Sequence, residues 1–409
     1  MPPLPAFLRR CLNWLNPRFL RDRRVLLALL ALAILYRLRR QGWFKRHHSV
    51  LQSDYPRAPR NYNVLPAFFP SRDGLWLWRR SWRTTAQKPR ATLVLCHGFS
   101  EHALRYEVLA RMLNRLNVDV YAFDLQGHGQ SQGCRAFVSQ FSDYADDLAD
   151  FIALVRAEQA KQVNNNQEHE DGDAHEHEDA YDTEHIDVFD SLDHSRSDHN
   201  DLPPLFLFGH SMGGAIVTHA LLRHAPGAPL APSTNDPRLQ KRNERATRAL
   251  SQVKGVVLSS PFLGINEGLA PPIVQKFAKW IASVMPKFRM ERLPLKYVSH
   301  DPCVVQRDAE DPLVIQGGPT LHWACTVMET LPLIQQHAHA FKWPLLVVAA
   351  GDDRIVDTPT TERFVDSVSS EDKCVRVIDG AFHEVLFETA AYRRQALQTL
   401  RNWLSERLK

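Results

Sequence analysis

A single serine in a glycine-rich turn carries the strongest chemical signal in this sequence. Ser211 is the middle residue of Gly-His-Ser-Met-Gly, with the apolar run Leu205–Phe208 before it and the helix-like stretch Ala215–His224 after it. A sharp strand-to-helix turn of this kind holds a serine hydroxyl clear of the backbone, where it can attack a carbonyl carbon. Gly209 and Gly213 are small because a side chain at either position would obstruct the turn. The sequence therefore predicts nucleophilic catalysis by Ser211.

A serine hydroxyl needs a general base, and the base needs an acid that orients it. In chains with this turn the acid and then the histidine follow the serine, each after a late strand. Asp352 and Asp353 come just after the apolar run Leu345–Ala349, and His383 lies just past Cys374–Ile378. This order predicts His383 as the base, with a purely structural loop histidine as the alternative. Spacing alone does not separate Asp352 from Asp353.

The attack of a serine on a carbonyl also needs two backbone N–H donors for the oxyanion that forms. One donor comes from the residue after the nucleophile, which is Met212, and the other from the loop after an early strand. His97-Gly98-Phe99 follows the apolar run Thr92–Cys96. We therefore expect the N–H groups of Phe99 and Met212 to form the oxyanion hole.

From about residue 60 the sequence alternates between short apolar runs and stretches of helical spacing. This alternation predicts an α/β protein with a mostly parallel sheet covered by helices on both faces. Together with the turn at Ser211 it indicates an α/β-hydrolase fold over residues 60–408. Asp73-Gly74 between two apolar runs predicts a hairpin at its start. The predicted strands are Leu65–Phe69, Leu75–Trp82, Thr92–Cys96, Val118–Phe123, Leu205–Phe208, Val253–Leu258, Leu345–Ala349 and Cys374–Ile378, and the predicted helices are Tyr106–Leu116, Phe141–Ala160 and Ala215–His224.

Three stretches interrupt this alternation. Residues 162–203 are rich in Asp, Glu, His and Asn and have little to bury, which predicts a disordered surface loop. The six histidines in that loop show no fixed ligand spacing, so no metal site is expected. Residues 226–250 are polar and basic and are predicted to be a second loop insertion. Residues 262–342 carry an apolar stripe at helical spacing, including Trp280, which predicts a helical cap whose apolar inner face meets the substrate.

The N-terminal residues 1–50 hold eleven Lys or Arg and a single acid, Asp22. The apolar run Val25–Tyr36 is shorter than the roughly 20 residues of a spanning helix, and basic residues rather than a cleavage site follow it. Upstream, apolar residues at helical spacing alternate with arginines, as in a basic helix that lies in an anionic membrane surface. We expect residues 1–45 to associate with a membrane; the alternative is a helical extension packed on the catalytic domain.

The composition, 44% hydrophobic and 23% charged, suits a globular protein with a sizeable core. The six cysteines are far apart and form no Cys-x-x-Cys pair, which favours free thiols in a reducing compartment. Cys96 and Cys374 lie in apolar and strand-like runs and are expected to be small buried residues. These features predict an intracellular protein on a cytoplasmic membrane face, without a nucleic-acid partner.

Seven segments carry a resemblance to a known family. The chain resembles the monoacylglycerol lipase and lysophospholipase group of α/β hydrolases, whose domain is often labelled serine aminopeptidase S33, over roughly residues 64–408. The matching segments are SRDGLWLWRRSW at 71–82, HGFSEH at 97–102 with Arg105-Tyr106, DLQGHGQSQG at 124–133, GHSMGG at 209–214, DPLV at 311–314, GDDRIVD at 351–357 and GAFHEVLFE at 380–388. The acidic insertion is foreign to the pattern.

The resemblance implies roles for particular residues. It implies that Asp353 is the acid of the triad and His383 its base, and it supports Phe99 and Met212 as oxyanion donors. It also implies that residues 262–342 are the cap that receives an acyl chain. The further matches Asp124, Gly127, His128 and Gly129 are interpreted as a structural turn.

These observations together predict a serine hydrolase that cleaves carboxylic esters of single-chain lipids, monoacylglycerols or lysophospholipids, through an acyl-enzyme and without a cofactor or metal. Alternatives on the same triad are a general carboxylesterase, an acyltransferase or a peptidase. An alternative of another class is a non-catalytic membrane adaptor that retains the fold. The expected partners are the lipid ester and a membrane surface.

Overall fold

The structure is a computed structural model that describes residues 67–86, 88–170, 202–264, 272–292 and 294–408, with the backbone alone for 164–170 and 272–277. The chain divides into two units, residues 1–55 and 56–409, and all the described residues belong to the second unit. The predicted membrane-associating segment, residues 1–50, lies outside the described residues. Among the helices that are described, none is long and apolar enough to cross a membrane.

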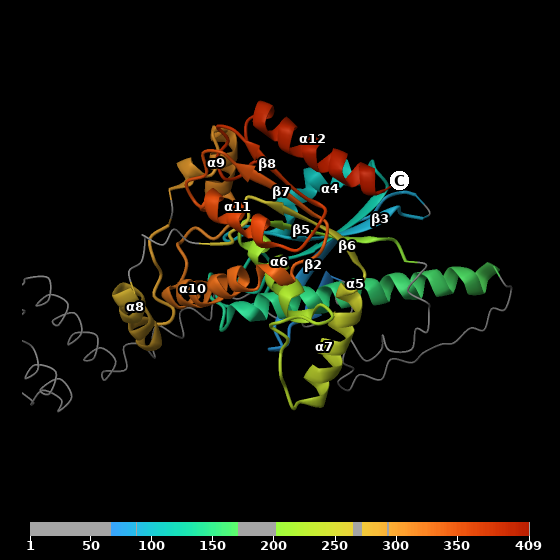
Figure 1. Cartoon of the computed structure of the whole chain (residues 1–409), viewed down its shortest axis with the longest axis horizontal. Helices are drawn as coiled ribbons and strands as arrows, with labels where there is room; N and C mark the ends of the chain where they lie inside the picture. The colour runs from blue at the N-terminus through green and yellow to red at the C-terminus, as the bar shows by residue number, and fades with distance from the viewer. Residues whose placement is uncertain (1–66, 87, 171–201, 265–271, 293, 409) are drawn as a thin grey trace, which may run out of the picture. The chain divides into compact units, whose positions relative to one another are not determined.

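The second unit is built on one eight-stranded sheet of the order β1-β2-β4-β3-β5-β6-β7-β8 (Figure 1). Strand β2 runs antiparallel to both of its neighbours, and the strands from β4 to β8 are parallel. The predicted α/β-hydrolase architecture is therefore confirmed, as is the first hairpin. The strands are β1 (Phe68–Pro70), β2 (Trp76–Trp82), β3 (Ala91–Cys96), β4 (Val118–Phe123), β5 (Leu205–His210), β6 (Val253–Ser259), β7 (Leu345–Ala350) and β8 (Lys373–Ile378).

The central strands β3, β4, β5 and β7 are buried along their whole length, because helices cover both faces of the sheet. Helices α5, α6, α7, α10 and α11 contribute to the apolar core on one side of the sheet, and α4 and α12 to the core on the other side (Figure 1). These helices are α4 (Glu107–Asn114), α5 (Phe141–Glu170), α6 (Met212–His224), α7 (Pro237–Leu250), α10 (Leu321–Gln336), α11 (Thr358–Ser367) and α12 (Ala390–Arg407).

The edge strand β8 departs from one expectation. Cys96 in β3 is buried, as predicted, but Cys374 in β8 is exposed. An edge strand of the sheet is covered less completely than a central one, so its side chains reach solvent. Both thiols are free, as are those of the other cysteines in the described part of the chain.

Helix α5 continues to Glu170, nine residues into the stretch 162–203 that is predicted to be a loop. Extending an existing helix fixes one residue for each hydrogen bond gained, which is far easier than starting a new helix. The first part of the predicted loop is therefore helical, and residues 171–201 lie outside the described residues.

The prediction of a loop at 226–250 is wrong for its second half. Residues Pro237–Leu250 form α7, which packs against α5 and α6. Asp236 caps this helix by accepting a hydrogen bond from the backbone N–H of Arg238, and Pro237 occupies the first helical position. Its buried residues are few and small, Ala246, Ala249 and Leu250. Because so few apolar residues are needed to bury this basic helix, its composition resembles that of a loop and the sequence predicts one.

The predicted cap region, residues 262–342, contains α8 (Pro272–Val284), a short 3₁₀ turn, α9 (Pro302–Glu310) and α10. The apolar stripe on α8 does not face inward throughout, because Trp280 is 44% exposed while Ala282 is buried. Helix α10 packs against both α8 and the core helices α5 and α6. The later part of this region is therefore as much a core helix as a cap.

Candidate active site

Ser211 occupies the turn between β5 and α6, where its backbone has φ 51° and ψ −120°. A non-glycine residue at positive φ is strained, typically by about 1–3 kcal/mol, and needs surroundings that hold it. Its N–H donates to the carbonyl oxygen of Ser259 on β6, and its own carbonyl oxygen accepts from the N–H of Phe262, both at 2.9 Å. The turn is thus fixed from both sides.

The glycines around Ser211 are required by contacts with backbone and side chain. A Cβ atom added to Gly209 would lie 2.5 Å from the carbonyl oxygen of Gly213, and one added to Gly214 would lie 2.6 Å from the Cβ atom of Pro261. A Cβ atom on Gly213 would collide with the carbonyl oxygen of Cys96 at the end of β3. The sequence argument for small residues in this turn agrees with these distances.

Hydrogen bonds join the three predicted triad residues. His383 Nε2 lies 2.8 Å from Ser211 Oγ, and His383 Nδ1 lies 2.7 Å from Asp353 Oδ2. Since a carboxylate only accepts, Nδ1 carries the proton and Nε2 is free to accept the proton of the serine hydroxyl. The backbone N–H groups of Ile355 and Val356 donate to Asp353 Oδ1 at 2.8 and 3.0 Å, which fixes the carboxylate.

Asp352 and Asp353, which both fit the spacing expected of the triad acid, have different surroundings. The side chain of Asp353 is fully buried against His383, whereas Asp352 is exposed. Only Asp353 therefore has the position of an orienting acid. Asp352 contributes its backbone N–H, which donates to the carbonyl oxygen of Ala381 at 3.0 Å and braces the loop that carries His383.

The electrostatics of the site favour a charged Asp353 and a basic His383. Burial disfavours the imidazolium of His383, but the charge and hydrogen bond of Asp353 outweigh it and raise the pKa of His383. Burial likewise opposes ionisation of Asp353, yet its bonds to His383 and to two backbone amides lower its pKa. The neighbouring ring of His210, 5.1 Å from that of His383, has its pKa lowered to about 3 by burial and by His383. His210 therefore stays neutral beside the base.

The two predicted oxyanion donors flank the serine. Met212 is the first residue of α6, where an N–H group has no acceptor within its own helix. On the other side, a Cβ atom added to Gly98 would lie 3.1 Å from the Cβ atom of Ser211. The loop residue that precedes Phe99 therefore lies next to the nucleophile, with no room for a side chain between them. These positions suit two N–H groups that converge on a carbonyl oxygen held at Ser211.

A buried charge cluster holds the loop that contains Phe99. Arg105 contacts the carboxylates of Glu101, Asp308 and Glu384 at 2.6, 2.8 and 2.8 Å. Glu101 in turn accepts hydrogen bonds from the backbone N–H of Gly98 and from the hydroxyl of Tyr106. Burial raises the pKa of Glu101, and it raises the pKa of Asp308 to about 7.

Sequence reasoning did not assign a role to this cluster. The segment HGFSEH with Arg105-Tyr106 carries a signal, because it places a carboxylate, an arginine and a tyrosine beside the oxyanion loop. Asp308 gives no local signal, since it is contributed by α9 of the cap region, 203 residues from Arg105. The cluster joins the oxyanion loop, the cap region and the residue that follows His383.

Further contacts attach the cap region to the same loop. Ser100 Oγ donates to the carbonyl oxygen of Ile315 at 2.7 Å, and the N–H of Ile315 donates to the carbonyl oxygen of Ser100 at 2.9 Å. The ring of Phe99 lies 4.6 Å from that of Trp323 on α10. The oxyanion loop therefore packs against the cap region through hydrogen bonds and an aromatic side chain.

The segment at Asp124 is a structural turn, as interpreted from the sequence. Asp124 is buried, and its carboxylate accepts from the backbone N–H groups of Ala103 and Gln130 at 2.8 and 2.7 Å. Gly127 and Gly129 both have positive φ. Among the described residues no group of three or more His, Cys, Asp or Glu side chains is placed to hold a metal. Most of the histidine-rich insertion lies outside those residues.

A family model described as serine aminopeptidase, S33, matches residues 87–165, 169–231 and 244–390. The chain belongs to this family. It is 26% identical to the monoglyceride lipase of Rattus norvegicus over 86% of this chain and 94% of that protein. It is 28% identical to the monoacylglycerol lipase of Mycolicibacterium smegmatis over 78% of this chain and 90% of that protein. A solved structure of a soluble variant of the Saccharomyces cerevisiae monoglyceride lipase superposes with a TM-score of 0.57 at 18% identity, covering 85% of this chain and 99% of that one.

Replacing Asp353 by Asn should lower kcat by on the order of 10⁴-fold, because an amide can donate to Nδ1 and so favours the wrong tautomer of His383. Asp352→Asn should stay close to the wild type, because its side chain is exposed. The measurement is steady-state hydrolysis of a p-nitrophenyl ester by the two variants. Equal losses in both, or full activity in Asp353→Asn, would contradict the assignment.

The pH dependence of kcat/KM should have an acid limb with a midpoint above 6.5, the ordinary pKa of histidine, because the pKa of His383 is raised. Activity is lost as pH falls through that value, since an imidazolium cannot accept the serine proton. The same shift stabilises the fold fully below pH 6.5 and loses its contribution as pH rises through the folded pKa. An acid limb centred below 6.5 would show that Asp353 does not support His383 in this way.

Proposed function

We propose that this protein hydrolyses carboxylic esters of single-chain lipids, monoacylglycerols first, through a covalent acyl-enzyme on Ser211. The observation that carries the proposal is the pair of hydrogen bonds, 2.8 Å from Ser211 to His383 and 2.7 Å from His383 to Asp353. A structural serine at a strained φ of 51° has no need of a buried histidine–aspartate pair aligned with its hydroxyl.

In the first half of the proposed reaction, Ser211 Oγ attacks the ester carbonyl carbon while His383 Nε2 takes the hydroxyl proton. Asp353 stabilises the resulting imidazolium without taking the proton itself. The N–H groups of Phe99 and Met212 bind the oxyanion, and each is worth about 3 kcal/mol of transition-state stabilisation. His383 then delivers its proton to the alcohol oxygen of the leaving group, the C–O bond breaks, and the acyl-enzyme remains.

In the second half, after the alcohol has left the site, water attacks the carbonyl carbon of the acyl-enzyme. His383 takes a proton from the water, the hydroxyl oxygen bonds to the acyl carbon, and a second oxyanion forms in the same site. Its collapse returns the proton to Ser211 Oγ and releases the carboxylic acid. No cofactor is consumed in this sequence, because every proton moves between the substrate, water and the pair of Ser211 and His383.

The choice of a lipid ester is supported by two independent observations. Several of the relatives that the chain matches along 90% or more of their length are named monoglyceride or monoacylglycerol lipases. In this chain Phe99 of the oxyanion loop packs against the buried Trp323 of α10, which places apolar side chains next to the reacting carbonyl. Apolar surface with few polar groups is typical of a site for an acyl chain.

We also propose that residues 1–45 bring the enzyme to a membrane surface on a cytoplasmic face. Their ten basic residues and the short run Val25–Tyr36 support binding within an anionic interface. Such a segment would place the hydrolase where single-chain lipid esters are dissolved.

Replacing Ser211 by Ala should abolish ester hydrolysis and labelling by a fluorophosphonate probe, because the variant lacks the hydroxyl that hydrogen-bonds to His383 Nε2. Ser367→Ala, at an exposed position of α11, is the matched control and should keep both. The measurement uses purified protein with monoacylglycerols, lysophospholipids and short p-nitrophenyl esters side by side. The highest kcat/KM is expected for a monoacylglycerol.

Three results of that experiment would contradict the proposal or a part of it. Unchanged hydrolysis in Ser211→Ala would exclude the acyl-enzyme, and a wild type that neither hydrolyses esters nor reacts with the probe would favour a non-catalytic adaptor. A preference for short esters or lysophospholipids over monoacylglycerols would leave the triad in place and overturn the proposed first substrate.

Deleting residues 1–45 should release the protein from liposomes that contain an anionic lipid, while hydrolysis of a water-soluble ester stays within about twofold of the wild type. The deletion removes the basic and apolar segment and none of the triad residues. The measurement is co-sedimentation of both proteins with the same liposomes. A full-length protein that remains in the supernatant, or a deletion variant that still sediments, would refute the membrane role.

A further inference from the structure

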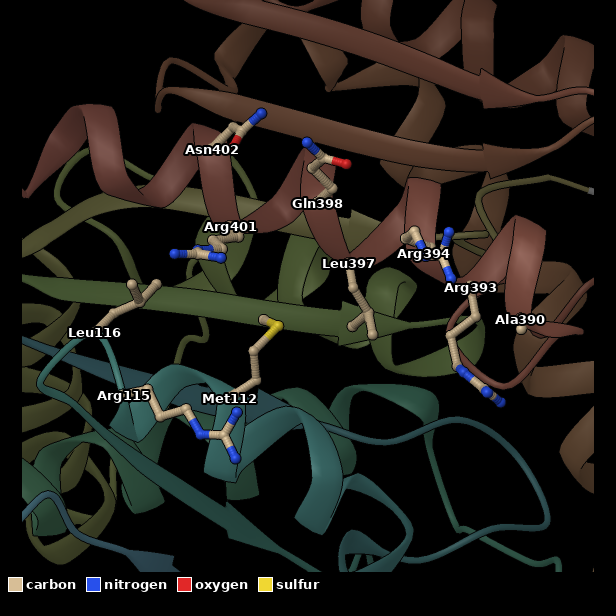
Figure 2. A pocket seen from close by; sticks show the side chains of 10 residues that line it. All are labelled: Met112, Arg115, Leu116, Ala390, Arg393, Arg394, Leu397, Gln398, Arg401 and Asn402. Carbon is tan, nitrogen blue, oxygen red and sulfur yellow. The ribbon is translucent and has the colours of Figure 1, made fainter.

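A cleft of about 710 Å³ lies between α4 and α12, on the face of the sheet opposite α5 and α6 (Figure 2). Its volume is within the range of about 300–1,000 Å³ that is usual for small-molecule sites. None of its lining residues belongs to the triad, the oxyanion loop or the cap region. The proposed hydrolysis therefore gives the cleft no role.

Four arginines line this cleft, Arg115 at the C-cap of α4 and Arg393, Arg394 and Arg401 from α12, and no acidic residue lines it. In the part of the chain that the structure describes, none of the four forms an ion pair. Arg393 donates one hydrogen bond to the backbone carbonyl oxygen of Glu388, at 3.2 Å. By contrast, the nearby Arg111 on α4 is paired with Glu107 on its own helix.

Two further features add to the positive potential. The only acid in the 18 residues of α12 is Glu406, in its last turn. The first residue of that helix, Ala390, lines the cleft, and its N-cap residue Thr389 makes no side-chain cap. The positive end of the helix dipole therefore faces the same space as the arginines.

The floor of the cleft is apolar. Met112 of α4, Leu116 just beyond the end of α4 and Leu397 of α12 line it, and all three are partly buried. Figure 2 shows the side chains of Met112 and Leu397 extending from their helices into the space between α4 and α12. An anion alone would leave this apolar surface uncovered, whereas an alkyl chain attached to the anion would cover it.

We propose that the α4–α12 cleft binds a single-chain lipid that carries a phosphate headgroup. Guanidinium groups bind phosphate oxygens bidentately and strongly, and several unpaired arginines match a headgroup of more than one negative charge better than a single carboxylate. The alkyl chain lies along Met112, Leu116 and Leu397. The site is separate from the catalytic one, and its ligand is not cleaved there.

The test measures binding of dodecyl phosphate, which has no carboxylic ester, to the full-length protein by isothermal titration calorimetry below its micellar concentration. Arg394→Gln/Arg401→Gln removes two exposed cleft arginines. Arg238→Gln/Arg248→Gln removes two exposed arginines from α7 and is the control of equal charge. We expect the cleft variant to bind at least tenfold more weakly and the control to bind like the wild type.

Companion ligands separate the contributions of head and chain. Inorganic phosphate, sodium dodecanoate and the neutral dodecyl glucoside should each bind the wild type at least tenfold more weakly than dodecyl phosphate. Equal binding of inorganic phosphate would overturn the role of the chain, and equal binding of dodecanoate or the glucoside would overturn the role of the phosphate. Equal losses in both double variants, or no loss in either, would overturn the site itself. Unchanged melting temperatures show that the variants are folded.

Discussion

Ser211 keeps a backbone conformation that L-residues rarely adopt because both of its peptide groups are held by neighbouring segments. The bond to Ser259 fixes it to β6, and the bond from Phe262 fixes it to the segment that leads into the cap region. The three glycines of the turn leave room for the helix, the strand and Pro261 to approach. The central sheet thus holds the hydroxyl of Ser211 clear of the backbone. If the turn between β5 and α6 were less rigid, this hydroxyl would be misplaced relative to His383.

A second constraint joins the parts that must meet around that hydroxyl. Arg105 is buried and contacts three carboxylates, one beside the oxyanion loop, one from the cap region and one next to the base. Buried charges of this kind contribute little net stability, but removing one partner leaves the others uncompensated. We therefore interpret the Arg105 cluster as a means of fixing geometry. Glu101 links this cluster to the oxyanion loop, because it accepts a hydrogen bond from the N–H of Gly98, next to Phe99.

The sequence predicts the bounds of all eight strands to within a few residues. For β3, β4, β5 and β7 the reason is that parallel strands buried on both faces are continuous apolar runs. The spacing of residues does not decide whether Asp352 or Asp353 is the acid of the triad. The two are adjacent, so both fit the spacing, and only the directions of their side chains differ. Helix α7 was missed because its apolar face is limited to a few residues near its end. The contact of Asp308 with Arg105 spans 203 residues and has no local signature.

The central claim is that Ser211 carries the acyl group during turnover. Rapid acid quench of the wild type with a p-nitrophenyl ester, followed by proteolysis and mass spectrometry, tests it most directly. A peptide that contains Ser211 should carry the acyl mass, and it should form as fast as the burst of p-nitrophenol. Steady turnover with no acylated peptide, or acylation of a different residue at that rate, would contradict the account.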